Sequence, residues 1–131
     1  MSMQKKTMLF IFPIILFVVF SGVLIAISKD KAVDIDAFDV SDYNYYIMHF
    51  PSEENLGNVS STDELLEKVE AIWIEEYGEE VKNEKPYQLL YDEKNDVWLV
   101  QGTLPLNMMG GVANILVEGN TGKVLAIWHD K

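Results

Sequence analysis

The stretch Asp96–Asp130 reads D-V-W-L-V-Q-G-T-L-P-L-N-M-M-G-G-V-A-N-I-L-V-E-G-N-T-G-K-V-L-A-I-W-H-D. It contains three short apolar runs, at Val97–Thr103, Val112–Glu118 and Lys123–Trp128. Each run is rich in β-branched and aromatic residues and is bounded by Gly, Pro or Asn, which is typical of strands rather than helices. The residues G-N-T-G at 119–122 predict a tight hairpin between the last two strands, because Gly and Asn tolerate positive φ.

A helix is predicted immediately upstream of these strands. Ser61 is a suitable N-cap, Glu64 completes a capping box, and Gly78 is the expected left-handed stop. Apolar residues recur between these limits with a period of 3.6, which places them on one face of the helix. They are Leu65, Leu66, Val69, Ile72, Trp73 and Tyr77.

A fourth strand is predicted at Tyr87–Tyr91, directly after a proline, and the polar loop Asp92–Asp96 joins it to the next strand. The connections between the strands leave no room for crossover helices, so neighbouring strands must be antiparallel. The expected fold class is therefore α+β, with one helix packed on a four-stranded antiparallel sheet. Trp98 is expected to pack from this sheet onto Val69 and Trp73 of the helix.

The chain begins with a predicted transmembrane helix. Leu9–Ile27 is a run of 19 residues without a charge. As a helix it would be roughly 28 Å long, close to the thickness of the bilayer hydrocarbon. Lys5 and Lys6 precede it and no acid occurs before Asp30, which predicts a single-pass cell-membrane protein with an extracytoplasmic C-terminal domain. A cleaved signal peptide is the alternative, because Ala26-Ile27-Ser28 could serve as a cleavage exit.

Three regions are expected along the chain. Residues 1–28 form the transmembrane signal anchor, residues 29–59 an acidic tether and packing segment, and residues 60–131 the α+β domain. Within the second region, Lys29–Tyr43 is interpreted as a linker that can add an edge strand. The aromatic run Tyr43–Phe50 is apolar enough to pack on the domain.

The chain is strongly acidic beyond the predicted anchor. From Lys29 onward there are 21 acids against 8 lysines, a net charge of −13, and the chain has no Arg. Nucleic acids require a basic surface, so direct nucleic-acid binding is disfavoured. The charge suits solubility and attraction to a basic protein partner. The chain also has no Cys, which excludes disulfides and thiolate metal sites.

Six acids are the candidate partner-binding residues, because solvated carboxylates can attract a basic partner while contributing little to the core. Three lie on the outer face of the predicted helix and three lie in the loop between the first two strands of the sheet. They are Glu67, Glu70, Glu75, Asp92, Glu93 and Asp96.

No catalytic, metal-binding or cofactor-binding residue is predicted. Glu76 falls within the apolar arc of the helix, where a carboxylate held against a sheet could act as an acid or base. The simpler interpretation is that the last helical turn passes the sheet edge and leaves Glu76 in water. His129 is most simply a histidine at a strand terminus, and with His49 far away in sequence the two are weak evidence of a metal site. Asp92–Asp96 lacks the glycine and the distal glutamate of a calcium loop.

Five short motifs between Ser60 and Lys131 resemble, in this order, one bacterial protein family. They are A-I-W-I-E-E-Y-G (Ala71–Gly78), K-P-Y (Lys85–Tyr87), V-W-L-V-Q-G-T-L-P (Val97–Pro105), G-G-V-A (Gly110–Ala113) and G-K-V-L-A-I-W-H-D-K (Gly122–Lys131). The family comprises small immunity proteins of polymorphic toxin systems, which are described as having an NTF2-like fold. Its members commonly close in His-Gly-Lys, whereas this chain closes in His129-Asp130-Lys131.

The resemblance implies a reduced NTF2-like domain that binds and neutralises a cognate protein toxin without catalysis. Together with the predicted anchor at residues 9–27 and the negative charge, it leads us to expect a membrane-anchored immunity protein whose toxin is basic. Two alternatives stay open. A likeness to PepSY-type modules implies an extracytoplasmic inhibitory or sensing module, and an NTF2-like pocket using Glu76 or His129 would imply a small enzyme.

Overall fold

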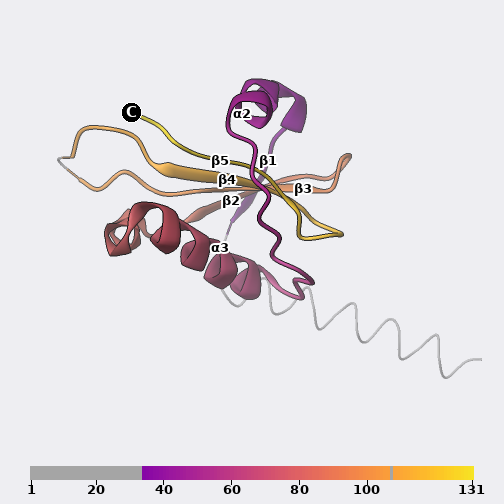
Figure 1. Ribbon diagram of the computed structural model, residues 1–131, viewed down its shortest axis with the longest axis horizontal. Coiled ribbons are helices and arrows are strands. Elements are labelled where there is room, and N and C mark those ends of the chain that lie inside the picture. Colours follow the sequence, from indigo (N-terminus) through magenta and orange to yellow (C-terminus); the bar gives the residue numbers. More distant parts are fainter. Residues whose placement is uncertain (1–33, 107) are drawn as a thin grey trace, which may run out of the picture. The chain divides into compact units, whose positions relative to one another are not determined.

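A five-stranded mixed sheet forms the centre of the computed structural model, which describes residues 34–106 and 108–131 (Figure 1). The strands, in their order across the sheet, are β1 (Ile35–Ala37), β2 (Gln88–Asp92), β3 (Val97–Gln101), β4 (Ala113–Glu118) and β5 (Val124–His129). From β2 to β5 each strand pairs antiparallel with the next, whereas β1 pairs parallel with β2. The predicted α+β class and the four antiparallel strands are confirmed.

The prediction of a purely antiparallel sheet of four strands is wrong, because Ile35–Ala37 adds a fifth, parallel strand at the edge. Three residues are too few to show the period-2 alternation that identifies a strand. Parallel pairing also requires a long crossover connection. The chain between β1 and β2 supplies one, which contains η1 (Val40–Tyr43), α2 (Asn44–His49), α3 (Thr62–Tyr77) and η2 (Glu79–Glu84). The edge strand itself agrees with the interpretation of Lys29–Tyr43 as a linker that can add one.

The long helix α3 covers one face of the sheet (Figure 1). Its residues Leu65, Val69 and Trp73 are buried, with at most 2% of each exposed. Alternate side chains of a strand face opposite sides of a sheet. Val100 and Ile115 therefore face α3, because their strand neighbours belong to the core cluster on the opposite face. The apolar face predicted for this helix is thus its buried face.

The short elements η1 and α2 cover the other face of the sheet (Figure 1). Tyr46 of α2 stacks on Trp128 of β5 with 4.2 Å between ring centroids, and Tyr43 lies 6.1 Å from the same indole. The buried residues of this cluster are Val97, Leu99, Leu116, Ala126 and Trp128. The aromatic run Tyr43–Phe50 therefore packs on the domain, as the sequence predicts.

Helix α3 begins and ends at the predicted residues, but its capping box differs from the predicted one. Ser61 is the N-cap, and its Oγ accepts a hydrogen bond of 3.1 Å from the backbone N–H of Glu64. The Glu64 carboxylate does not return to Ser61 but accepts from the backbone N–H and the hydroxyl of Ser60, at 3.0 and 2.6 Å. The helix ends at Gly78, whose φ of 91° favours glycine.

The segment Phe50–Ser60, here called the strap, runs along the outer edge of β5. The backbone N–H of Ile127 donates to the carbonyl of Phe50 at 3.1 Å, and that of Val124 donates to the carbonyl of Glu54 at 3.0 Å. An uncovered edge strand is a template for unwanted pairing with another chain. The strap accepts hydrogen bonds from backbone N–H groups of this edge, and it therefore occupies the side of β5 with which a foreign strand would pair.

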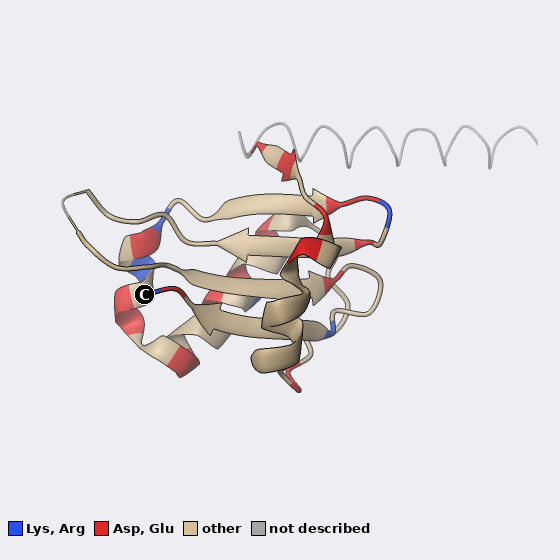
Figure 2. Ribbon diagram, turned by 90° about the horizontal axis from the view of Figure 1, so that it is seen from above, with Lys and Arg blue, Asp and Glu red and all other residues tan. Residues whose placement is uncertain are grey.

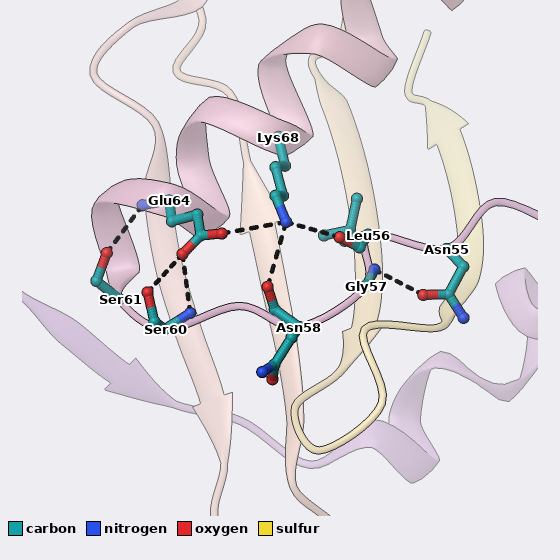
Figure 3. A network of polar contacts seen from close by, with 8 residues as sticks. All are labelled: Asn55, Leu56, Gly57, Asn58, Ser60, Ser61, Glu64 and Lys68. Carbon is teal, nitrogen blue, oxygen red and sulfur yellow. Dashed lines mark hydrogen bonds and ion pairs between the residues drawn. The ribbon is translucent and has the colours of Figure 1, made fainter.

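One lysine of α3 ties the far end of the strap to the helix (Figure 3). The Nζ of Lys68 donates to the carbonyl oxygens of Leu56 at 2.9 Å and Asn58 at 3.2 Å, and pairs with the Glu64 carboxylate at 3.1 Å. A lysine ammonium has three donors and no acceptor, so this arrangement uses its full capacity. The strap is therefore held by β5 along its length and by α3 at its end.

Trp98 faces α3 as expected, but it does not take the central place in the core. It is half-buried, and its ring lies 4.5 Å from that of Tyr91 on the neighbouring strand. Trp73, which is fully buried, meets Tyr87 edge to face at 5.1 Å. The buried tryptophan of this face is thus on the helix rather than on the sheet.

Within residues 34–106 and 108–131, the structure has no helix that is both long and apolar enough to cross a membrane. The predicted transmembrane helix at Leu9–Ile27 lies outside the described residues.

Candidate partner-binding surfaces

The three candidate acids of α3 are not equivalent in the structure. Glu67 and Glu75 are exposed. Glu70 is partly buried and accepts hydrogen bonds from the hydroxyl of Tyr87 at 2.8 Å and from the ammonium of Lys85 at 2.9 Å. Desolvation would raise the pKa of Glu70, but these two donors outweigh it and lower the pKa. Glu70 therefore has a structural role, and it links α3 to the start of β2.

The three acids at the turn from β2 to β3 also differ in their environment. Asp92 is buried, with 4% exposed, and accepts from the backbone N–H groups of Val40 at 2.9 Å and Asn95 at 3.0 Å. Hydrogen bonds from Val40 and then from Asn95 lower the pKa of Asp92. Asp96 accepts from the hydroxyl of Tyr91 at 2.7 Å, a bond that raises the pKa of Tyr91 to about 12. Only Glu93 of this group is exposed.

The acidic residues are spread over α3, η2 and the connecting loops, with few lysines between them (Figure 2). The structural roles of Glu70, Asp92 and Asp96 contradict the assumption that all six candidate acids are solvated. Their carboxylates are occupied by internal donors, so a partner could reach them only at the cost of those bonds. Glu67, Glu75 and Glu93 are exposed to solvent, as predicted for all six acids.

One groove contains acids from both sides of the β5 edge and has a volume of about 440 Å³. The strap forms one wall, through Glu53 and Glu54, and the last turns of α3 form the other, through Glu75 and Glu76. All four carboxylates are exposed. The apolar part of the lining consists of Phe50, Pro51, Ile72 and Ile127. This groove, called here the strap groove, has no basic residue in its lining.

A second candidate surface is the loop between β3 and β4. Leu104, Leu106, Met108 and Met109 expose 43, 92, 59 and 98% of their surfaces. Large apolar side chains gathered on one exposed loop are a feature of interaction sites, and methionine adapts well to varied partners. This loop is called here the apolar loop.

The residues considered as a possible acid, base or metal ligand lie in exposed positions. Glu76 is exposed on the wall of the strap groove, so the burial required of an acid or base held against the sheet is absent. His129 is exposed at the end of β5, where its Nε2 lies 3.4 Å from Glu84 and its ring 5.3 Å from that of Tyr77. His49 stacks on Tyr45 at 4.1 Å. Among the described residues, no group of His, Asp and Glu is arranged to hold a metal ion.

Sequence reasoning missed two features that depend on distant contacts. Glu53 and Glu54 were assigned to a tether and packing segment, yet they line the same groove as Glu75 and Glu76 of α3. Asn114 is a fully buried polar residue of β4 that accepts from Gln101 at 2.8 Å and donates to Asp130 at 3.2 Å. An asparagine inside an otherwise apolar strand run was the available signal for this network.

Comparisons with known proteins identify the family of this chain. A family described as NTF2 fold immunity protein matches residues 66–131, about half of the chain. The uncharacterized protein YbbC of Escherichia coli (strain K12) is 33% identical over 99 residues, which cover 70% of this chain and 80% of that protein. No solved structure matches. The matched residues include most of α3, the apolar loop and the α3 wall of the strap groove. The chain therefore belongs to the family of NTF2 fold immunity proteins.

Proposed function

We propose that this protein neutralises a cognate protein toxin by binding it, without catalysing a reaction. The observation that carries the proposal is the family match over residues 66–131. An immunity protein needs a surface that recognises one partner, and the described residues offer two such surfaces. They are the apolar loop and the acidic strap groove.

The apolar loop is proposed as the centre of the toxin interface. Leu106 and Met109 expose 92% and 98% of their surfaces, so burying them against a partner removes apolar area from water. Interfaces concentrate their binding energy in a few such residues, surrounded by polar ones. The net charge of −13 from Lys29 onward favours a basic toxin, because complementary charge raises the rate of encounter.

The test is whether the protein protects cells in which a candidate toxin, taken from a neighbouring gene, is expressed. The wild-type chain is expected to restore growth and to co-purify with the toxin. Replacing Leu106 and Met109 with serine should weaken both, because about 1 kcal/mol or more is lost when a central interface residue is truncated. Met48→Ser is the matched control, since Met48 is also exposed, at 76%, but lies on α2. Full protection by the double variant would exclude the apolar loop as the centre of the toxin interface. A wild-type protein that gives no protection would exclude toxin neutralisation as the function.

Membrane anchoring is a separate proposal, supported by the uncharged run Leu9–Ile27 and the preceding Lys5 and Lys6. In this arrangement the C-terminal domain lies outside the cytoplasm and meets the toxin at or beyond the membrane. A reporter that is active only outside the cytoplasm, fused after Lys131, should be active. Activity of a cytoplasm-only reporter at the same position would overturn the assignment.

A further inference from the structure

We propose that the strap groove receives a lysine or arginine side chain of the toxin, an inference that rests on the proposed function and specifies its recognition chemistry. Four carboxylates, Glu53, Glu54, Glu75 and Glu76, border an apolar floor in a groove of about 440 Å³. A side chain with an aliphatic stem and a cationic end matches both features, because the stem packs on apolar surface while the charge meets the acids.

The charge of the groove is not balanced by described residues. The lysines that form ion pairs in the described part of the chain do so elsewhere, with Glu64, Glu70 and Glu79. No ion pair within that part reaches the four groove acids. Like charges held near one another repel, and an incoming cation would relieve this repulsion. The groove therefore offers charge complementarity to a basic side chain before any partner arrives.

An amphipathic cation fits the lining better than a metal ion does. Among residues 34–106 and 108–131, no group of carboxylates is arranged to hold a metal. Ile72 of α3 and Ile127 of β5 line the groove together with the four acids, and Phe50, also in the lining, is 43% exposed. A hydrated metal ion gains nothing from these apolar contacts, whereas the methylene groups of lysine or arginine can cover them.

The walls of the groove are held in place by the fold. Phe50 and Glu54 accept backbone hydrogen bonds from β5 at 3.1 and 3.0 Å, and the Glu54 N–H donates to Ser52 Oγ at 3.1 Å. The opposite wall is the last part of α3, whose adjacent residue Trp73 is fully buried. A binding site that is ordered beforehand loses less conformational entropy when it binds.

A larger groove at β1 does not share these properties. It measures about 690 Å³ and includes Lys94 in its lining. Two of its acids are already occupied, since Asp39 accepts from Ser41 and Asp92 accepts from Val40. The strap groove is thus distinguished by unpaired acids rather than by size.

The test compares two quadruple variants of the full chain with equal loss of charge. The groove variant carries Glu→Gln at residues 53, 54, 75 and 76. The control variant carries Glu→Gln at residue 80 and Asp→Asn at residues 34, 36 and 42, which are exposed acids outside both the groove lining and the set of candidate partner-binding acids. Association with the toxin is measured at two salt concentrations. The groove variant should associate about tenfold more slowly and lose most of its salt dependence, and the control should change far less.

A second measurement does not depend on the toxin. Amide NMR shifts of the full chain in detergent are followed during titration with acetyl-Gly-Arg-Gly-amide and with its neutral citrulline analogue. Saturable shifts at Phe50 and Ile127 with the arginine peptide alone, absent in the groove variant, support the proposal. No saturation, or equal response to both peptides, overturns it. Unchanged toxin association by the groove variant also overturns the groove proposal, but it leaves the proposed toxin neutralisation standing. A wild-type protein that protects no cells overturns toxin neutralisation, but it does not overturn binding of the arginine peptide.

Discussion

At the scale of single residues, neighbouring acids of the same type have opposite roles. Asp92 is buried and accepts hydrogen bonds from Val40 and Asn95, whereas Glu93 beside it is exposed. Asp92→Asn replaces an oxygen acceptor by a donor against these N–H groups. We expect a loss of about 1.5–3 kcal/mol in unfolding free energy, as for hydrogen bonds to a charged group. Glu93→Gln is the control and should stay within about 0.5 kcal/mol. Equal urea midpoints for the two variants would contradict the structural role of Asp92.

Glu64 should make stability depend on pH in a defined window. Hydrogen bonds from Ser60, and then from Lys68, lower the pKa of Glu64 to about 2 from a usual value of 4.5. The unfolded chain therefore binds the proton more readily, and folding is favoured when the carboxylate is ionised. This contribution is fully present above pH 4.5 and is lost as the pH falls towards 2. Glu64→Gln should lower the thermal midpoint at neutral pH. The difference in midpoint between this variant and the wild type should shrink as the pH falls from 4.5 towards 2. A difference that stays constant would refute the coupling between Glu64 ionisation and folding.

At the scale of elements, the core beneath α3 depends on the helix tryptophan more than on the strand tryptophan. Trp73 is 0% exposed, and Trp98 is half-buried against Tyr91. Trp73→Ala should cost about 3–5 kcal/mol, because it leaves a cavity as well as losing apolar burial. Trp98→Ala should cost on the order of 1–2 kcal/mol, since part of its surface is already in water. Chemical denaturation of both variants tests this order, and the reverse order would show that the packing is misassigned.

The strap should loosen when its lysine anchor is removed. Lys68 donates to Leu56 and Asn58, so Lys68→Met keeps the apolar stem and deletes these bonds. A loss of about 1 kcal/mol in local stability would speed amide exchange at Leu56, which donates to Gly122, several-fold. The amide of Leu89 in the sheet core should not change. Lys94→Met is the charge-matched control, because Lys94 is exposed in the turn between β2 and β3, and faster exchange in both variants would assign the effect to charge rather than to the anchor.

At the scale of the whole molecule, the net charge of −13 from Lys29 onward should oppose folding by self-repulsion. Raising the ionic strength from about 0.01 M to about 0.15 M shortens the Debye length from ~30 Å to ~8 Å. The thermal midpoint should therefore rise with added sodium chloride. It should rise less in the groove variant, which carries four fewer charges. A midpoint that is independent of salt in both proteins would show that the acids are already screened.

Local patterns in the sequence were sufficient for the main elements. Short apolar runs bounded by Gly, Pro or Asn predicted the four antiparallel strands, because turn residues and side-chain alternation act within a few positions. Ser61 and Gly78 predicted both ends of α3, since caps satisfy the backbone groups of the adjacent turn. The family motifs lie in this same part of the chain.

Features that depend on distant contacts required the tertiary structure. The parallel pairing of β1 with β2 joins segments separated by the whole of η1, α2, α3 and η2. Asp92 accepts a hydrogen bond from Val40, 52 positions away, and nothing in the adjacent sequence distinguishes it from Glu93. The strap groove exists because the strap and α3 meet beside the edge of β5. Sequence determines which residues are acidic or apolar, but burial and pairing depend on which chain segments the fold brings together.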